Sequence, residues 1–363
     1  MSKGPSYPLS MVQILTMAVE QNASDVHIVP MDRPMFRIDR DMIKLDYPEL
    51  KPENVKELLV QIIQPYQVEI LKKDLELDFS YSIPNVARFR GNVMFQRGTV
   101  AIALRIVPFK VPNLDDLGVL PGVKELCPLP RGLVLVTGPT GSGKSTTLAA
   151  MIDIINRERD LNIVTVEDPI EFLHAHKKST VKQREVGIDT KSFANALRHV
   201  LRHDPDVILI GEMRDLDSIS IALTAAETGH LVFSTLHTQT APLTINRIVD
   251  VFAEEQRDQI RQQLTGSLQA VLSQQLMPKA SGAGRVMAME FLKSSTAVKT
   301  MIREGKEHQL YSVMQASHAA GMKTMDQSLL DLFNGGAITR EEALEKCIDK
   351  TEMERLMQRT TVN

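Results

Sequence analysis

Short apolar runs and segments of helical periodicity alternate through the middle of the chain. The runs at residues 133–136, 163–166, 207–210 and 231–234 have the length of strands and carry few polar side chains. Strands buried on both faces have this pattern, and their alternation with helices predicts a parallel sheet covered by helices on both sides. From about residue 255 onward the pattern predicts a wholly helical region.

The first 110 residues have a different pattern. Two helical apolar faces, at residues 11–19 and 55–62, are followed by residues 89–95 and 100–106, where apolar and polar positions alternate. A short turn joins these two runs into a predicted hairpin with one apolar and one partly basic face. We therefore expect a small α+β domain over residues 1–110.

Five prolines between residues 108 and 130 separate the two patterns. Because proline fixes its backbone and cannot donate a hydrogen bond, this density predicts an extended, stiff linker over residues 111–130. A chain of 363 residues is also long for one domain. The second domain is expected over residues 131–363.

Composition and charge narrow the possible functions. The net charge is −3, tryptophan is absent and aromatic residues make up 4% of the chain, which argues against a nucleic-acid partner. The two cysteines, Cys127 and Cys347, are far apart in sequence and typical of a reducing compartment. The sequence has no signal-peptide core and no apolar run of about 18 residues. We expect a cytoplasmic protein.

Residues 138–145 carry the most specific motif. They read Gly-Pro-Thr-Gly-Ser-Gly-Lys-Ser, follow an apolar strand and open a helix, as a phosphate-binding loop does. Lys144 is expected to reach the β- and γ-phosphates of ATP and Ser145 to hold Mg²⁺, whereas the alternative is a glycine-rich turn with a surface lysine. The predicted binding residues are Gly138, Pro139, Thr140, Gly141, Ser142, Gly143, Lys144, Ser145 and Thr146.

Carboxylates follow the next two predicted strands. Glu167, Asp168 and Glu171 come after the second strand, and Glu212 follows the third, where Gly211 occupies a position that is Asp in many ATPases. Because the carboxyl ends of parallel strands share one edge, these groups are candidates for holding Mg²⁺, partly through water. Glu212 and Glu171 join Lys144 as candidate catalytic residues. The alternatives are an ordinary acidic loop and a helix-capping glutamate.

Two histidines flank the fourth predicted strand. A histidine near a strand end is more often structural than catalytic, but this strand also points towards the expected nucleotide edge. His230 and His237 are therefore candidates either for contact with the γ-phosphate or for a subunit interface.

Together these motifs resemble the secretion-and-pilus family of hexameric ATPases. The resemblance rests on the phosphate loop and on three further motifs: Glu-Asp-Pro-Ile-Glu at 167–171, Gly-Glu-Met-Arg-Asp at 211–215 and a histidine box over 230–237. Within the family, the chain is most similar to the members that retract type IV pili in twitching motility. The segments that carry this closer resemblance are residues 23–28, 78–81, 87–90, 225–230 and 321–327.

The resemblance implies an α/β fold: a small N-terminal α+β, PAS-like domain and a C-terminal RecA-like P-loop ATPase domain with a helical extension. It also implies a homo-hexamer that binds ATP and Mg²⁺ beneath an inner-membrane pilus platform and reaches the membrane through partners only. Neighbouring subunits would complete each pocket with arginines; Arg90, Arg97 and Arg105 are candidates, and plain solvent-facing arginines are the alternative.

Three other functions stay open at this point. An accessory retraction paralogue would share all of these motifs. Pilus-assembly and type II secretion ATPases usually carry a four-cysteine zinc module, which two distant cysteines cannot build. A nucleotide-gated binding protein without turnover would need neither Glu171 nor Glu212.

Overall fold

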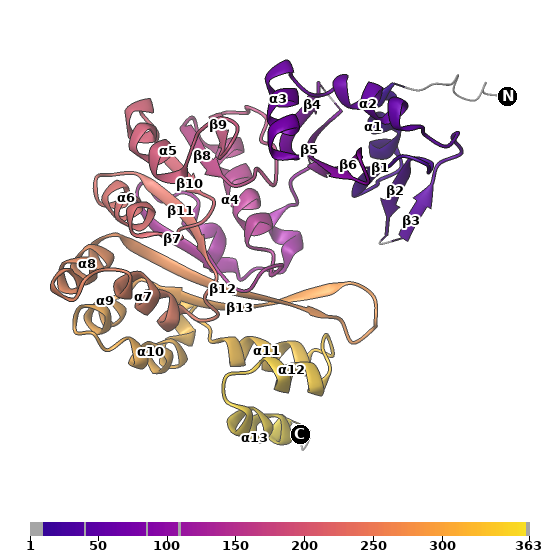
Figure 1. Cartoon of the computed structure of the whole chain (residues 1–363). Coiled ribbons are helices and arrows are strands. Elements are labelled where there is room, and N and C mark those ends of the chain that lie inside the picture. The colour runs from indigo at the N-terminus through magenta and orange to yellow at the C-terminus, as the bar shows by residue number, and fades with distance from the viewer. Residues whose placement is uncertain (1–9, 40, 85, 108–109, 361–363) are drawn as a thin grey trace. The chain divides into compact units, whose positions relative to one another are not determined.

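The computed structural model describes residues 10–39, 41–84, 86–107 and 110–360 (Figure 1). The chain divides into two compact units. The first is Met1–Lys110 with Glu171–Leu173, and the second is Val111–Ile170 with His174–Asn363.

The first unit is built on a six-stranded antiparallel sheet in the order β3-β2-β1-β6-β5-β4. Its core lies between the sheet and the helices. The predicted apolar face of the first helix, with Met11, Ile14 and Leu15, is buried in this core. The elements are α1 (Met11–Glu20), β1 (Asp25–Ile28), β2 (Met35–Ile38), β3 (Asp41–Lys44), α2 (Pro52–Val60), α3 (Pro65–Asp74), β4 (Glu76–Ile83), β5 (Ala87–Gln96) and β6 (Thr99–Val107).

The predicted hairpin is β5–β6. Its turn residues Arg97 and Gly98 both have positive φ, 48° and 75°, as a two-residue hairpin turn of type I′ requires. Gly91 lies beneath the ring of Phe79 on β4, where an added Cβ would come within 2.3 Å of ring carbons. A side chain at this position would therefore clash with the core of the unit.

The second unit contains a seven-stranded sheet in the order β13-β12-β7-β11-β10-β8-β9. All neighbouring strands are parallel except β12 and β13. The four strands expected from apolar runs are all present. The strands are β7 (Gly132–Thr137), β8 (Asn162–Glu167), β9 (Thr180–Glu185), β10 (Val207–Ile210), β11 (Leu231–Leu236), β12 (Leu268–Pro278) and β13 (Arg285–Lys293).

Helices cover both faces of this sheet, as predicted. Leu133 and Leu135 pack with α5 to α8, whereas Val134 and Val136 pack with α4 on the other face. The helices are α4 (Lys144–Glu158), α5 (Phe193–Val200), α6 (Leu216–Glu227), α7 (Ala241–Asp250), α8 (Glu254–Ser267), α9 (Thr296–Arg303), α10 (Leu310–Ala316), α11 (Met325–Asn334), α12 (Arg340–Lys346) and α13 (Lys350–Thr360), with 3-10 turns at Leu114–Leu117, Pro121–Leu126, Leu201–His203, Glu307–Gln309 and His318–Ala320.

Two expectations about the second unit are wrong. Residues beyond 255 are not wholly helical, because β12 and β13 form a long hairpin that extends the sheet beside β7 (Figure 1). Buried polar residues such as Ser273 and Gln274 interrupt the apolar pattern of β12, so the pattern does not predict these strands. Residues 111–130 are not an extended linker either: the segment forms two 3-10 turns and buries Leu114 and Val123 against α4. Pro108 lies outside the described residues.

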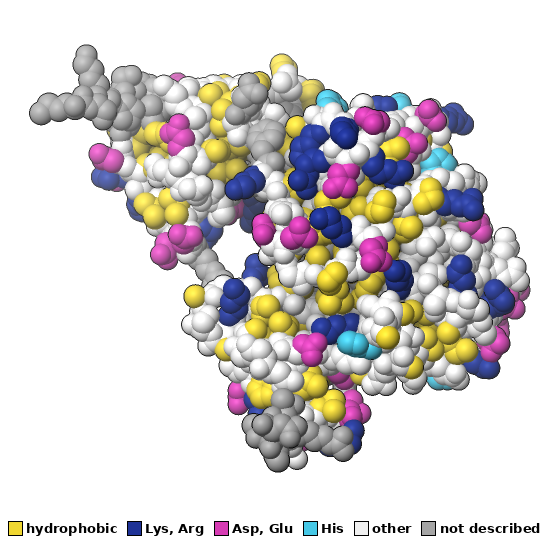
Figure 2. All heavy atoms as spheres, turned by 180° about the vertical axis from the view of Figure 1, so that it is seen from behind, with side chains coloured by type: hydrophobic (Ala, Val, Ile, Leu, Met, Phe, Trp, Pro, Cys, Tyr) yellow, Lys and Arg dark blue, Asp and Glu magenta, His cyan; other side chains and the backbone are white. Residues whose placement is uncertain are grey.

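Two surface properties follow from the composition. On the face shown in Figure 2, basic and acidic side chains are interspersed, in keeping with the net charge of −3. Over the described ranges, no helix is both long and apolar enough to cross a bilayer.

Candidate functional site

The phosphate loop joins the end of β7 to the start of α4, as predicted. Gly138, Gly141 and Gly143 all have positive φ, at 139°, 78° and 89°, a region that disfavours other residues. A Cβ on Gly138 would also lie only 2.2 Å from the carbonyl oxygen of Gln274 on β12. The glycine pattern of the motif is therefore required by both the turn of the loop and its close approach to the neighbouring strand.

Lys144 lies within this loop and is 8% exposed. Its Nζ donates hydrogen bonds to the carbonyl oxygens of Gly138, at 2.9 Å, and Pro139, at 3.1 Å. Burial lowers the pKa of the ammonium, whereas the nearby charge of Glu212 raises it. The side chain thus faces the loop and Glu212 rather than the apolar core.

Gln274 on β12 supports the phosphate loop, although it belongs to no sequence motif. Gln274 is fully buried, and its Nε2 donates to Oγ1 of Thr147 in the first turn of α4, at 2.8 Å. Its backbone also packs against Gly138. A polar residue in an apolar strand was the available signal, but the strand itself was not predicted.

Glu212 lies at the same sheet edge, two residues after the end of β10. Arg214 Nη2 is 2.7 Å from its Oε2, and His237 Nε2 is 3.1 Å from its Oε1. Gly211 fits the close approach of the chain after β10 to the end of the parallel strand β8, because its N–H donates to Val166 O at 2.7 Å and a Cβ would lie 3.1 Å from Glu167 Cα. The acidic residue at this edge is therefore Glu212 rather than residue 211. Arg214 and His237 each contact one of its carboxylate oxygens.

The carboxylates after β8 differ in their surroundings. Glu167 is 8% exposed and accepts hydrogen bonds from Thr165 Oγ1 at 2.6 Å and Gln183 Nε2 at 3.1 Å. Asp168 Oδ2 lies 4.0 Å from Arg214 Nη1, so one guanidinium faces both Asp168 and Glu212. Glu171 is exposed and grouped with the first unit, and its contribution to this edge stays a prediction.

The two histidines lie at opposite ends of β11. His237 follows the strand, beside Glu212, and Thr235 Oγ1 ties this end to the Gly211 carbonyl at 2.6 Å. His230 precedes the strand, where its carbonyl accepts from Gly132 N at the start of β7. A six-residue strand spans about 20 Å. His230 is thus about one strand length from His237, and its predicted role, contact with a γ-phosphate or a subunit interface, stays a prediction.

The three candidate arginines belong to the first unit. Arg90 on β5 and Arg105 on β6 are directly paired across the sheet and share a face, and Arg97 is in the turn between the strands. Arg105 Nε lies 2.8 Å from Asp25 Oδ1, although 69% of its side chain is exposed. Contact of these arginines with a nucleotide stays a prediction.

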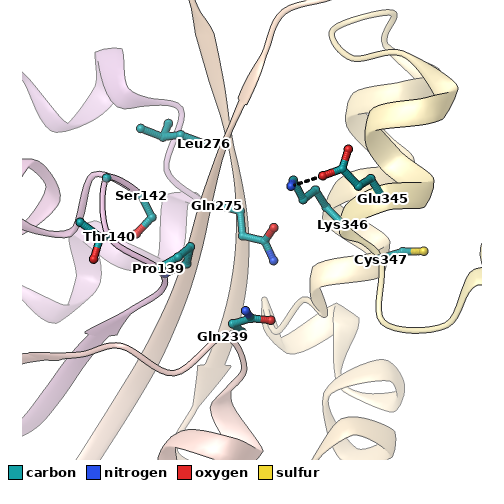
Figure 3. Close-up of a pocket in the computed structure, with 10 residues that line it drawn as sticks. Pro139, Thr140, Ser142, Gln239, Gln275, Leu276, Glu345, Lys346 and Cys347 are labelled. Atoms are coloured by element: carbon teal, nitrogen blue, oxygen red, sulfur yellow. Dashed lines mark hydrogen bonds and ion pairs between the residues drawn. The ribbon is translucent and has the colours of Figure 1, made fainter.

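A cavity of about 420 Å³ adjoins the first half of the phosphate loop. Figure 3 shows α12 on one side, the loop on the other and Gln275 of β12 between them. The lining residues are Pro139, Thr140, Gly141, Ser142, Gln239, Gln275, Leu276, Glu345, Lys346 and Cys347. The end of α12 thus faces the loop, although no motif marks this segment.

Comparison with known proteins decides the family. The family model described as Type II/IV secretion system protein matches residues 2–345. This chain belongs to that family. The resemblance inferred from the motifs is confirmed.

Relatives of this family member are similar over nearly their whole length. The chain is 47% identical over 338 residues to the "Type IV pilus retractation ATPase PilT" of Pseudomonas aeruginosa, covering 93% of this chain and 98% of that protein. It is 46% identical over 344 residues to a "Twitching motility protein" of Neisseria gonorrhoeae, covering 95% and 92%. A crystal structure of "the Pilus Retraction Motor PilT and Bound ADP" matches with a TM-score of 0.89 at 50% identity, covering 96% and 99%. The predicted fold class is confirmed.

In this member of the family, cationic and acidic groups face each other at one sheet edge. The phosphate loop and Lys144 supply donors for phosphate oxygens. Glu212 supplies a carboxylate whose position is fixed by Arg214 and His237. Such an arrangement can bind a phosphate chain and orient a water molecule towards it.

Proposed function

We propose that this chain is an ATPase that powers the retraction of type IV pili in twitching motility. The observation that carries the proposal is the 47% identity to a pilus retraction ATPase over 98% of that protein's length. The geometry of the loop supports the catalytic part, because the loop, Lys144 and Glu212 share one edge of the sheet.

Some residues of the site bind the phosphates, and others activate the attacking water. The loop N–H groups and the start of α4 bind the phosphates, and Lys144 exchanges its bonds with Gly138 and Pro139 for bonds to phosphate oxygens. Glu212 orients the attacking water and accepts its proton. Arg214 and His237 hold the carboxylate in place, which limits the reorganisation needed during the reaction.

The donor set at this edge fits Mg²⁺. The hydroxyl of Ser145 is exposed at the start of α4, and Glu167, Asp168 and Glu212 supply hard oxygen atoms, some of them through water. Within the described residues, no three His, Cys, Asp or Glu side chains form a metal-binding group, which suits an ion that usually keeps water and phosphate ligands. When bound, Mg²⁺ neutralises phosphate charge.

The working form in this proposal is a homo-hexamer at the inner face of the cytoplasmic membrane, docked on a platform protein of the pilus. Arg90 and Arg97 are exposed and basic, and Arg105 is mostly exposed, which supports a role in completing the site of a neighbouring subunit. His230 is a further candidate for a group at the subunit interface, and Glu171 remains a candidate for catalysis and for holding Mg²⁺.

The proposal is tested by gene deletion and complementation. Deletion should leave cells with surface pili that cannot crawl, and the wild-type gene, but not Lys144→Ala, should restore movement. Loss of pili from the deletion strain would instead favour an assembly ATPase. A purified wild-type protein that binds ATP without releasing phosphate would favour the nucleotide-gated binding protein.

A further inference from the structure

A buried carboxylate lies in the same row of the sheet as the last residue before the phosphate loop. Thr137 of β7 pairs with Ser273 of β12, which pairs with Glu290 of β13. All three are fully buried, and Thr137 Oγ1 donates to Ser273 Oγ at 2.9 Å. Glu290 is therefore two strands from the root of the loop, yet it belongs to none of the motifs.

Glu290 accepts hydrogen bonds from the first residues of two helices. Ala241 N of α7 donates to its Oε1 at 2.6 Å, and Met325 N of α11 donates to its Oε2 at 3.2 Å. Both helix N-termini favour a negative charge at this point. On one side the carboxylate therefore fixes the start of α7, four residues after His237, which contacts Glu212.

On the other side, the residue after Met325 extends the connection. Asp326 Oδ1 accepts from Ile348 N at 2.7 Å, and its Oδ2 accepts from Asp349 N at 3.1 Å and from the Tyr311 hydroxyl at 3.1 Å. Ile348 and Asp349 form the junction between α12 and α13. This junction directly follows Cys347, which lines the cavity beside the phosphate loop.

We propose that Glu290 is a positioning residue for ATP hydrolysis. Its carboxylate fixes the loop that presents His237 to Glu212 and, through α11 and Asp326, fixes the end of α12 against the phosphate-loop cavity. The two buried carboxylates thus join the catalytic edge of the sheet to the C-terminal helices. The proposal rests on the ATPase function proposed above.

The chemistry of the carboxylate supplies a sharp variant. Glu290→Gln has nearly the same volume but only one acceptor oxygen, so its amide NH₂ must face one of the two backbone N–H groups. One helix start is then released while the core remains filled. A matched control is Glu307→Gln. Glu307 is 4% exposed, accepts a hydrogen bond from Arg261 Nε at 3.0 Å and does not line the cavity beside the phosphate loop.

The first readout is steady-state ATP hydrolysis by the full-length protein. We expect Glu290→Gln to lower kcat between about 10-fold and 10²-fold with little change in KM, because the binding loop is intact and Glu212 is misplaced. Glu290→Asp, which keeps both acceptor oxygens, should recover part of the loss. Glu307→Gln should hydrolyse ATP at the wild-type rate. Equal kcat for wild type and Glu290→Gln would overturn the proposal.

The second readout is alkylation of Cys347. Cys127 is 2% exposed and burial raises its pKa to about 12, so labelling reports on Cys347. ATP should slow the labelling of wild type, and this response should be lost in Asp326→Asn, which releases one backbone N–H of the α12–α13 junction. This variant keeps the test decisive if Glu290→Gln fails to fold; an unchanged ATP response in Asp326→Asn would contradict the proposal.

The same experiments separate this inference from the proposed function. Wild-type protein without any ATP hydrolysis would show that the ATPase assignment is wrong. Active wild-type protein with an equally active, folded Glu290→Gln variant would refute only the positioning role.

Discussion

His237 holds the carboxylate of Glu212 from the neighbouring strand, with Nε2 3.1 Å from Oε1. The contact joins the ends of β10 and β11, which the hydrogen bond from Thr235 Oγ1 to Gly211 O also connects. A histidine at a strand end thus has a specific partner in this fold: it fixes the acidic group that faces Lys144.

This relationship predicts the effect of His237→Ala. Glu212 would keep only its contact with Arg214, so the carboxylate should sample more positions and kcat should fall roughly tenfold, with ATP binding retained. Phosphate release and binding of a fluorescent ATP analogue, measured on the same sample, check this. His318→Ala, at an exposed position, is the control. A variant with wild-type kcat would show that the contact has no catalytic role.

Lys144→Ala should abolish ATP hydrolysis without unfolding the protein. The ammonium bonds only carbonyl oxygens of its own loop among the described hydrogen bonds, so its removal leaves the apolar core unchanged. Phosphate release should drop to background while the thermal melt followed by circular dichroism stays near that of wild type. Hydrolysis at the native rate would contradict the nucleotide assignment.

The sequence predicted the parts of the site that local chemistry determines. The phosphate loop and Glu212 could be placed on one edge because parallel strands buried on both faces are recognisable as apolar runs. Without the strand register, the sequence does not distinguish the two ends of β11, so it predicts the same roles for His230 and His237.

Long-range contacts account for what the sequence did not predict. Strands β12 and β13 carry buried polar residues whose partners are distant in sequence: Glu290 bonds Ala241 and Met325, which are 49 and 35 residues away. Gln274 similarly bonds Thr147, 127 residues away. No periodicity within a short window reports such contacts, so neither the hairpin nor its supporting role could be inferred.

The buried carboxyl of Glu290 predicts a pH dependence of stability. Burial raises its pKa from 4.5 to about 7, against the opposing effect of the N–H groups of Ala241 and Met325, while the charge of Asp326 raises it further. Because the folded-state pKa lies above the unfolded value, the contribution of this group is complete below about pH 4.5 and is lost as pH rises through 7.

The difference in unfolding free energy between wild type and Glu290→Gln should therefore be more favourable to wild type at pH 5 than at pH 8. Urea denaturation of both proteins at the two pH values measures it, and the comparison cancels the titration of other groups. A difference that is constant with pH would show that Glu290 has the same pKa in the folded and unfolded protein.

We expect a charge-reversed α9 to separate ATP hydrolysis from force transmission, because in our proposal the basic face of this helix, Lys299 and Arg303, couples the ring to a neighbouring subunit or to the platform protein. Val298 and Ile302 are buried, whereas Arg303 is exposed and Lys299 half-buried, so the double variant Lys299→Glu with Arg303→Glu should preserve the fold. We expect basal ATP hydrolysis within about twofold of wild type, because these residues have no phosphate-binding role. Twitching on agar should nevertheless stop, with excess surface pili. A strain that twitches normally would exclude α9 as the coupling element.

Live imaging of labelled pili tests most directly whether hydrolysis at this sheet edge powers retraction. In a deletion strain, the wild-type gene should restore cycles of extension and withdrawal. Glu212→Gln keeps the shape of the side chain and removes its charge, so the purified variant should bind ATP but hydrolyse it at least about 10²-fold more slowly. Cells that carry it should extend pili and fail to withdraw them. Withdrawal at the wild-type rate by cells whose variant lacks hydrolysis would contradict the account.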